Sequence, residues 1–209
     1  MIGSYHSNRK PRHYGLLLQV LLITATPTIA QCSDVTSPPS QVHEKLEFAD
    51  LDGKSHSLKA SASHRALVLI FVTTDCPIAN SYQPSLARLY KEFQPKGFEF
   101  VLIHEGPNQS PKELKVHSEE YAVPFSIAMD AEHIIAQRVG ATKTPEVFVM
   151  GGDGAILYQG RIDNLHQGFG KKRASVTRED LRIALCEFDC GKTIGIPKTD
   201  AVGCSIQLK

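Results

Sequence analysis

Cys76 lies at a position where a protein can activate a thiol, because it follows an unbroken apolar run and precedes the pattern of a helix. Backbone N–H groups and the dipole at the start of a helix stabilise a thiolate, so the pKa of this cysteine is expected to fall. Asp75 opposes that effect weakly, since water screens an exposed carboxylate. A thiolate here could attack a disulfide. The competing interpretation is an inert buried cysteine.

The second thiol of a Cys-x-x-Cys pair is missing, since Ala79 stands in its place. In a dithiol site, the second cysteine attacks the mixed disulfide formed by the first and releases the substrate. If the reaction at Cys76 is to repeat, a distant cysteine must attack the mixed disulfide instead. The chain has four further cysteines, which are Cys32, Cys186, Cys190 and Cys204. With five in all, at least one stays free or pairs with another molecule in an oxidising compartment.

The first thirty residues have the parts of an export signal. They open with three basic residues, Arg9, Lys10 and Arg12. An apolar core at 16–23 and a small-residue end at Ala30 follow, so we predict a signal peptide over residues 1–30 and an exported protein, periplasmic or extracellular. A retained membrane anchor is the poorer alternative, because the apolar core is short for a bilayer. Lipid attachment at Cys32 is also poorer, because Gln31 is not the small residue that lipidation needs.

Composition divides the rest of the chain into a linker, one domain and a tail. Loss of the signal removes three of 23 basic residues and none of 22 acidic residues, leaving 20 against 22. A slightly acidic chain gives no electrostatic footprint for nucleic acid, so no such partner is expected. Residues 31–42, rich in Ser, Thr and Pro, predict a flexible linker. Residues 43–190 are long enough for one domain with its own core, and residues 191–209 form a tail carrying Cys204.

The elements that position Cys76 predict an α/β fold with a central mixed sheet flanked by helices. Continuous apolar runs are typical of central strands covered on both faces, and they occur at 66–72 and 98–103. A hairpin is expected within 45–58, and shorter strands at 124–129, 146–150 and 155–158. Helices are expected from Cys76 with a kink at Pro84, from Ser110 to Tyr121, from Asp130 to Val139, and from Thr177 to Cys186.

Several segments together resemble the thioredoxin superfamily, and within it the exported redoxins related to alkyl hydroperoxide reductase and thiol-specific antioxidant proteins. The matching segments are residues 67–77, Pro84, residues 140–149 and the Asp153-Gly154 turn. The resemblance covers about residues 43–190 and implies a thioredoxin-like fold with an N-terminal hairpin. It also implies that the Thr144-Pro145 bond is cis and that its loop lies against Cys76.

By this resemblance, Cys76 is the attacking thiol and Ala79 occupies the resolving position. Pro77 and the Thr144-Pro145 loop are expected to bind substrate, the loop by pairing with the substrate backbone. Glu146 follows that proline and is a candidate proton acceptor.

The tail around Cys204 looks like the ending of some exported redoxin-like proteins, so we predict that Cys204 is the resolving thiol and reaches Cys76 from a flexible tail. A structural disulfide from Cys204 to Cys186 or Cys190 stays open as the alternative. Cys186 and Cys190 could instead form a metal clip, as in copper-delivering relatives of this fold. That interpretation is weak, because no histidine accompanies the pair, and no metal is assigned.

The sequence therefore predicts an exported thiol–disulfide oxidoreductase that acts on protein or small-molecule disulfides and thiols. No cofactor is expected, and a membrane electron donor is a candidate partner. One alternative is a peroxiredoxin-like thiol peroxidase, since Thr73-x-x-Cys76 matches part of the peroxidatic pattern. Against it, Leu69 replaces the upstream proline, and Thr144-Pro145 stands where those enzymes carry an arginine. The other alternative is a non-catalytic module that binds partners or metal.

Overall fold

The computed structural model describes residues 46–107 and 109–208. The predicted signal peptide, the predicted linker and Cys32 lie outside the described residues, so they stay predictions. Within the described ranges, no helix is long and apolar enough to cross a bilayer.

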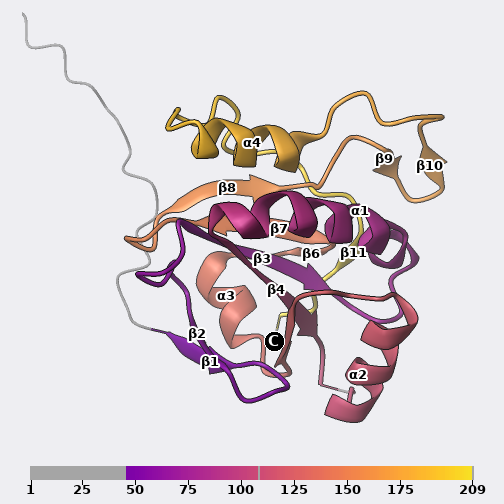
Figure 1. The fold of residues 1–209 in the computed structure, drawn as a ribbon. Helices are drawn as coiled ribbons and strands as arrows, with labels where there is room; N and C mark the ends of the chain where they lie inside the picture. Colours follow the sequence, from indigo (N-terminus) through magenta and orange to yellow (C-terminus); the bar gives the residue numbers. More distant parts are fainter. Residues whose placement is uncertain (1–45, 108, 209) are drawn as a thin grey trace, which may run out of the picture. The chain divides into compact units, whose positions relative to one another are not determined.

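A five-stranded mixed sheet forms the centre of the fold, with the strand order β5-β4-β3-β7-β8 (Figure 1). Its strands are β3 (Ala66–Val72), β4 (Phe98–Glu105), β5 (Ser126–Asp130), β7 (Glu146–Met150) and β8 (Ile156–Gly160). β4 runs parallel to β3 and β5, whereas β7 runs antiparallel to β3 and β8. Every residue of β3 is buried, as its continuous apolar run predicts. The predicted mixed sheet is confirmed.

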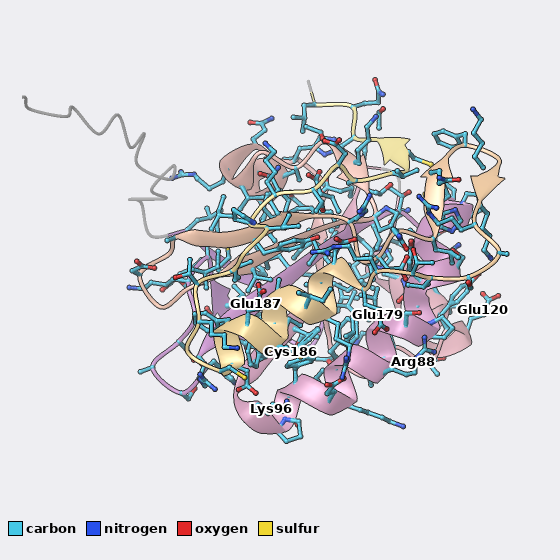
Figure 2. The ribbon with its side chains drawn as sticks, turned by 90° about the horizontal axis from the view of Figure 1, so that it is seen from above. Arg88, Lys96, Glu120, Glu179, Cys186 and Glu187 are labelled. Carbon is cyan, nitrogen blue, oxygen red and sulfur yellow. The ribbon has the colours of Figure 1, made fainter. Side chains whose placement is uncertain are left out.

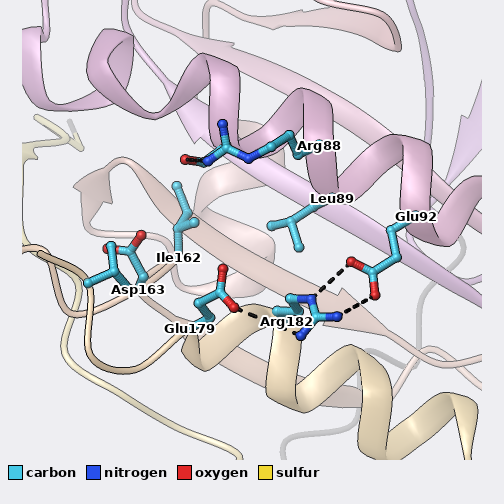
Figure 3. A pocket seen from close by; sticks show the side chains of 9 residues that line it. Arg88, Leu89, Glu92, Ile162, Asp163, Glu179 and Arg182 are labelled. Carbon is cyan, nitrogen blue, oxygen red and sulfur yellow. Dashed lines mark hydrogen bonds and ion pairs between the residues drawn. The ribbon is translucent and has the colours of Figure 1, made fainter.

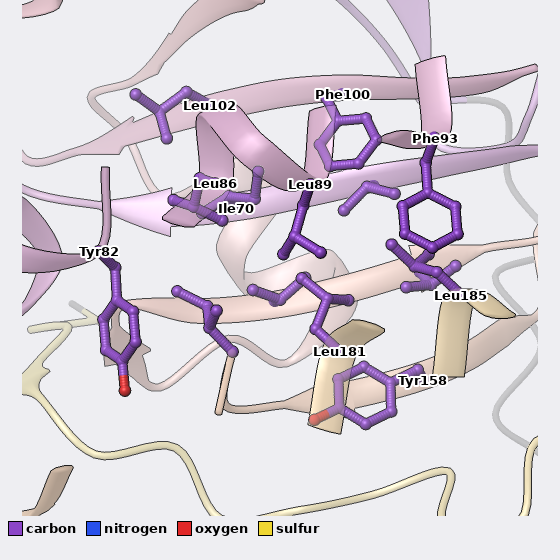
Figure 4. Packing of buried hydrophobic residues seen from close by; sticks show 14 of the residues in the cluster. Ile70, Tyr82, Leu86, Leu89, Phe93, Phe100, Leu102, Tyr158, Leu181 and Leu185 are labelled. Carbon is purple, nitrogen blue, oxygen red and sulfur yellow. The ribbon is translucent and has the colours of Figure 1, made fainter. Parts of the chain in front are cut away.

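Helices cover both faces of this sheet (Figure 1). They are α1 (Pro77–Phe93), α2 (Pro111–Glu120), α3 (Ile134–Val139) and α4 (Asp180–Asp189), with a 3-10 turn η1 (Gln94–Lys96) after α1. α1 and α4 share one face, where Leu86, Phe93 and Leu185 pack with Ile70 and Phe100 of the sheet (Figure 4). α3 packs on the other face. Each fully buried Leu or Phe contributes about 1.5–3 kcal/mol, so the sheet-to-helix contacts hold the start of α1 in place.

α1 runs through Pro84, where the sequence predicts a kink. Two predicted helix starts need correction. α3 begins at Ile134 rather than just after Asp130, although Asp130 still caps it, because its carboxylate accepts the N–H groups of Ile135 and Ala136 at 3.1 and 2.8 Å. α4 begins at Asp180 rather than after Thr177. The Thr177 hydroxyl does not cap it, because that oxygen accepts a 2.7 Å hydrogen bond from the Asn164 amide.

Three short antiparallel strand pairs surround the central sheet. β1 (Glu47–Ala49) and β2 (Ser55–Ser57) confirm the predicted N-terminal hairpin. β9 (His166–Gly168) pairs with β10 (Lys171–Lys172), and β6 (Lys143–Thr144) pairs with β11 (Cys204–Ser205). The last two pairs are not predicted from the sequence, and the β6–β11 pair proves important for the site.

His56 joins the N-terminal hairpin to β4. Its side chain is fully buried, with Nε2 2.9 Å from Asp50 Oδ2 and Nδ1 3.2 Å from Glu99 Oε1. Burial alone would lower the pKa of His56, but hydrogen bonds to Glu99 and Asp50 outweigh it and raise the pKa above 6.5. Hydrogen bonding to His56 also lowers the pKa of Glu99 to about 2. His56, Asp50 and Glu99 therefore form a buried ionic cluster that links the N-terminal hairpin to β4.

His56→Ala is expected to lower the free energy of unfolding by about 3 kcal/mol at pH 5.5, because the buried Asp50 carboxylate loses its cation and Glu99 keeps only Lys54, whose Nζ lies 2.6 Å away. Since the pKa of His56 is raised in the folded state, its contribution is complete below pH 6.5 and is lost as pH rises through the folded pKa. Urea unfolding at pH 5.5 and pH 9 should show the difference shrinking. The control is His64→Ala, because His64 is 31% exposed and 3.5 Å from Glu99. Equal His56→Ala losses at both pH values would contradict the assignment.

Candidate active site

Cys76 is the N-cap of α1, as the sequence predicts. Its backbone is extended, with φ −83° and ψ 107°, and its side chain is fully buried. Pro77 fills the first helical position, where a missing N–H is tolerated because that group has no partner within the helix. The backbone N–H of Ala79 donates to the Cys76 sulfur. The start of α1 thus presents a hydrogen-bond donor to this thiol.

The Thr144-Pro145 peptide bond is cis, and its loop lies against Cys76. The Cys76 thiol donates to the carbonyl oxygen of Thr144 at 3.1 Å. The hydroxyls of Thr73 and Thr144 are 3.5 Å apart across the same junction. The structure therefore brings together Cys76, Thr144 and Pro145, with Pro77 exposed beside them.

Cys204 is the second thiol of the site. Its Sγ lies 3.1 Å from the Sγ of Cys76, although 128 positions separate the two residues in the chain. β11 carries Cys204 to this place by pairing with β6, in a register that sets Cys204 opposite Thr144 and Ser205 opposite Lys143. A disulfide has an S–S length of about 2.05 Å, so the two sulfurs need to approach by only about 1 Å to bond.

The tail that carries Cys204 is hydrogen-bonded to the domain, whereas the sequence predicts a flexible segment that reaches Cys76. Along β8, the N–H of Gln159 donates to the carbonyl of Pro197 at 2.8 Å, and the N–H of Thr199 donates to the carbonyl of Gln159 at 2.9 Å. Beyond Cys204, the N–H of Ile206 donates to the carbonyl of Thr142 at 3.0 Å. The tail is therefore attached to the domain on both sides of Cys204.

The environments of the two sulfurs shift their pKa values in opposite directions. Burial by itself raises the pKa of Cys76, but hydrogen bonds from the backbone of Ala79 and from the thiol and backbone of Cys204 bring it below 9.0. Burial, together with its hydrogen bond to Cys76 and the charges of Cys76 and Asp75, raises the pKa of Cys204 to about 11. Cys76 thus loses its proton first, while Cys204 keeps its own.

Alkylation of reduced protein at different pH values is expected to give a midpoint below 9.0 for Cys76, followed as the mass of the Cys76 peptide. Cys204→Ala should raise that midpoint, because the thiolate loses its S–H donor. A wild-type midpoint at or above 9.0, or one that Cys204→Ala does not move, would contradict this electrostatic account. Cys186→Ser serves as the control and should leave the midpoint unchanged.

Glu146 holds the loop in front of the cis proline. Its buried carboxylate accepts hydrogen bonds from the backbone N–H groups of Thr142 and Lys143, at 2.8 and 3.1 Å, and from the amide of Gln159 at 3.2 Å. Side chains alternate along β7, and Val147 packs in the cluster that contains Cys76, so Glu146 points to the opposite face. These are the contacts of a positioning residue, and proton acceptance by Glu146 stays a prediction.

Cys186 and Cys190 lie at the other end of α1 from Cys76. Cys186 is on α4 (Figure 2), and the charges of Glu92 and Lys96, which lie near the C-terminal end of α1, act on its thiol. The 17 residues of α1 span about 25 Å, so this end is far from the active-site turn. Cys76, Cys186, Cys190 and Cys204 are all free thiols in the structure. Among the residues that the structure describes, no three His, Cys, Asp or Glu side chains could hold a metal together.

A polar network supports the turn before Cys76, and it joins Asn80 on α1, Gln109 in the loop before α2 and His117 on α2. The Asn80 amide donates to the carbonyl of Thr74 at 2.8 Å, and Asn80 Oδ1 lies 3.1 Å from Nε2 of His117. The Gln109 amide donates to the Thr74 hydroxyl at 2.6 Å. A cavity of about 650 Å³ opens beside this network and is lined by Thr74, Gln109 and His117, among others. Sequence reasoning missed these residues, because their polar side chains meet only in the folded protein.

A smaller pocket of about 240 Å³ between α1 and α4 contains none of the site residues (Figure 3). Two of its charged groups form an ion pair between α1 and α4, since the Arg182 guanidinium donates to both oxygens of Glu92 at 2.8 and 2.9 Å. The residues of this pocket therefore hold α1 and α4 together, and the pocket is not the active site.

Two solved structures are similar to this chain over most of its length, and a third is similar over about half of it. A structure of a hypothetical protein from Sinorhizobium meliloti 1021 has 24% identity and a TM-score of 0.69, over 80% of this chain and 92% of that one. An uncharacterized conserved protein from Geobacillus kaustophilus has 28% identity and a TM-score of 0.69, over 82% and 92%. A putative thioredoxin from Neisseria meningitidis has 22% identity and a TM-score of 0.50, over 57% and 79%, which shows the thioredoxin-like fold. A search among curated proteins returned no match.

A profile of the AhpC/TSA family matches residues 39–159. The matched segment is more than half of the chain and contains both Cys76 and the Thr144-Pro145 loop. It ends before the tail that carries Cys204. The chain therefore belongs to the AhpC/TSA family of thioredoxin-fold redox proteins.

Proposed function

We propose that this protein is a thiol–disulfide oxidoreductase whose redox pair is Cys76 and Cys204. The observation that carries the proposal is the 3.1 Å distance between their sulfurs, beside the cis Thr144-Pro145 loop. The opposite shifts of their pKa values support it, because an attacking thiol must be ionised while its partner waits as a thiol.

The reaction begins when the Cys76 thiolate attacks one sulfur of a substrate disulfide. The substrate S–S bond breaks, one substrate thiolate leaves and takes a proton, and the other half stays bound to Cys76 as a mixed disulfide. Cys204 then attacks Cys76 Sγ, loses its proton and releases the second substrate thiol. Two electrons pass from the cysteine pair to the substrate, and the protein ends with a Cys76–Cys204 disulfide.

The electrostatics of the pair favour this order of steps. Part of the rise in the pKa of Cys204 comes from its hydrogen bond to Cys76 and from the charge of Cys76. Both contributions vanish when Cys76 enters a mixed disulfide, because the sulfur is then neutral. The pKa of Cys204 should fall at that moment, so Cys204 becomes a nucleophile only when there is a bond for it to attack.

Protein disulfides and small-molecule disulfides are the proposed substrates. The export signal pattern at residues 1–30 supports action in an oxidising compartment, where spent protein needs re-reduction. A membrane electron donor is the proposed source of those electrons.

The test compares how fast a disulfide and a peroxide oxidise the reduced full-length protein. Oxidation of Cys76 is followed by quenching and mass spectrometry after addition of hydroxyethyl disulfide or hydrogen peroxide. The proposal predicts that the disulfide reacts and that peroxide reacts slowly. Peroxide consumption at the rate of dedicated peroxidases would favour the thiol peroxidase instead. Failure of both reagents to oxidise Cys76 would favour a binding module.

A further inference from the structure

β11 occupies a place that an external strand could take, and its sequence shows what would fit. We infer that the edge of β6 that β11 covers binds extended polypeptide strands in which glycine directly precedes the reacting cysteine. The inference rests on the proposed function, because the partner's cysteine would be the one that Cys76 attacks.

The contacts between β6 and β11 are those of strand addition, and among the described residues β6 pairs with no other strand. Cys204 and Ser205 pair with Thr144 and Lys143, and the following N–H, that of Ile206, donates to the carbonyl of Thr142. Main-chain hydrogen bonds of this kind accept any sequence, so selectivity must come from the side-chain positions. The sulfur of Cys204, 3.1 Å from Cys76, marks where the sulfur of a bound strand would lie. That separation suits nucleophilic attack.

The position before the cysteine has no room for a side chain. A Cβ on Gly203 would collide with the carbonyl oxygen of Thr144 and would lie 2.6 Å from its carbonyl carbon and 3.0 Å from the nitrogen of Pro145. These are backbone atoms of a loop that Glu146 holds from the other side, so they cannot easily move away. Gly203 is not among the glycines with positive φ, so space rather than backbone conformation requires glycine here.

The neighbouring positions make weaker demands. Ser205 is exposed, and its hydroxyl accepts a 2.7 Å hydrogen bond from Lys143 Nζ. Val202 is partly buried against the core on the α1 face, and Ile206 is partly buried against the core on the α3 face. A fitting strand therefore has the pattern apolar, glycine, cysteine, any residue, apolar.

The strand within the protein competes with such a partner. β11 is tethered, which gives it a high effective concentration at this edge of β6. Yet β11 is only two residues long, so besides its own pairing a partner strand has to replace only the bond from the Ile206 N–H to Thr142 and the bond from Lys143 to Ser205. Gly203→Ala should weaken this competitor selectively, because the clash that excludes alanine from a partner strand acts equally on β11.

The experiment uses full-length reduced protein with serine at Cys32, Cys186 and Cys190, so that only the redox pair reacts. The probes are the peptide Ala-Val-Gly-Cys-Ser-Ile, its cysteine activated as a 2-thiopyridyl disulfide, and a matched peptide with alanine in place of glycine. Release of pyridine-2-thione measures attack by Cys76. The small reagent 2,2′-dithiodipyridine, which has no backbone to pair, is the control.

The glycine peptide is expected to react at least about tenfold faster than the alanine peptide, the size of a tight steric clash. The Gly203→Ala protein should react with the glycine peptide faster than its parent does. Equal rates for the two peptides, with a control reagent that still reacts, would overturn the inferred strand-binding site with its requirement for glycine. The proposed function would remain intact. The ratio in the parent protein decides the matter even if Gly203→Ala folds poorly. A control reagent that fails to react at Cys76 would instead overturn the proposed function.

Discussion

Cys76→Ser is expected to abolish disulfide reduction, with a fall of at least about 10³-fold, as is typical for loss of a nucleophile. A serine hydroxyl is not ionised near neutral pH, so the Ala79 N–H and the Cys204 thiol would have no thiolate to stabilise. The fold should survive, because serine is similar in size and can still donate to the carbonyl of Thr144. The assay is reduction of hydroxyethyl disulfide by the purified, reduced protein.

Cys186→Ser is the matched control for this loss. Cys186 is a free thiol on α4, near the end of α1 that is farther from Cys76. Burial raises its pKa, so it should contribute little to the reaction. Activity that survives in Cys76→Ser, or that disappears in Cys186→Ser, would show that the reacting thiol lies elsewhere.

Cys204→Ser is expected to react once and then stop. Attack by Cys76 needs no second thiol, and the serine hydroxyl can still donate to the Cys76 thiolate, so a mixed disulfide should form at close to the wild-type rate and then accumulate. Its resolution would depend on a thiol from solution instead of one held beside it, so steady-state turnover should fall at least about a hundredfold. Intact-mass spectrometry after a single addition of disulfide measures the trapped adduct.

Cys190→Ser controls for the loss of a cysteine as such, because Cys190 is exposed at the end of α4. It should turn over normally and trap no adduct. Sustained turnover in Cys204→Ser would mean that another thiol resolves the mixed disulfide, and the role of Cys204 would have to be abandoned.

The local features of the site could be predicted from the sequence, because short-range chemistry determines them. The apolar run of β3 places Cys76 at the end of a central strand, and Pro77 marks the first position of the following helix. The capping box between Ser110 and Glu113 likewise fixes the start of α2 where the sequence indicates.

A helix start is harder to predict from the sequence where a residue from another part of the fold binds the side chain that could cap the helix. Thr177 has the chemistry of an N-cap, but Asn164 from a preceding loop takes its hydroxyl, and α4 starts later. Such a contact depends on the tertiary fold, so no local pattern in the sequence reveals it.

The position of Cys204 could be proposed from the sequence, but the path of its tail could not be predicted. A two-residue strand such as β11 has no periodicity to detect. Its placement depends on Thr199, which packs against Gly160 of β8 and hydrogen-bonds to Tyr158 at 2.8 Å. The need for glycine at position 203 likewise becomes visible only once the facing backbone is known.

Disulfide mapping tests the pairing of Cys76 with Cys204 most directly. Reduced full-length protein is treated with a stoichiometric disulfide, digested without reduction, and analysed by mass spectrometry for cross-linked peptides. The account predicts that the main product links Cys76 to Cys204, and that Cys204→Ser removes this product. A main link from Cys76 to Cys186 or Cys190, or no link between Cys76 and Cys204 with any oxidant, would contradict it.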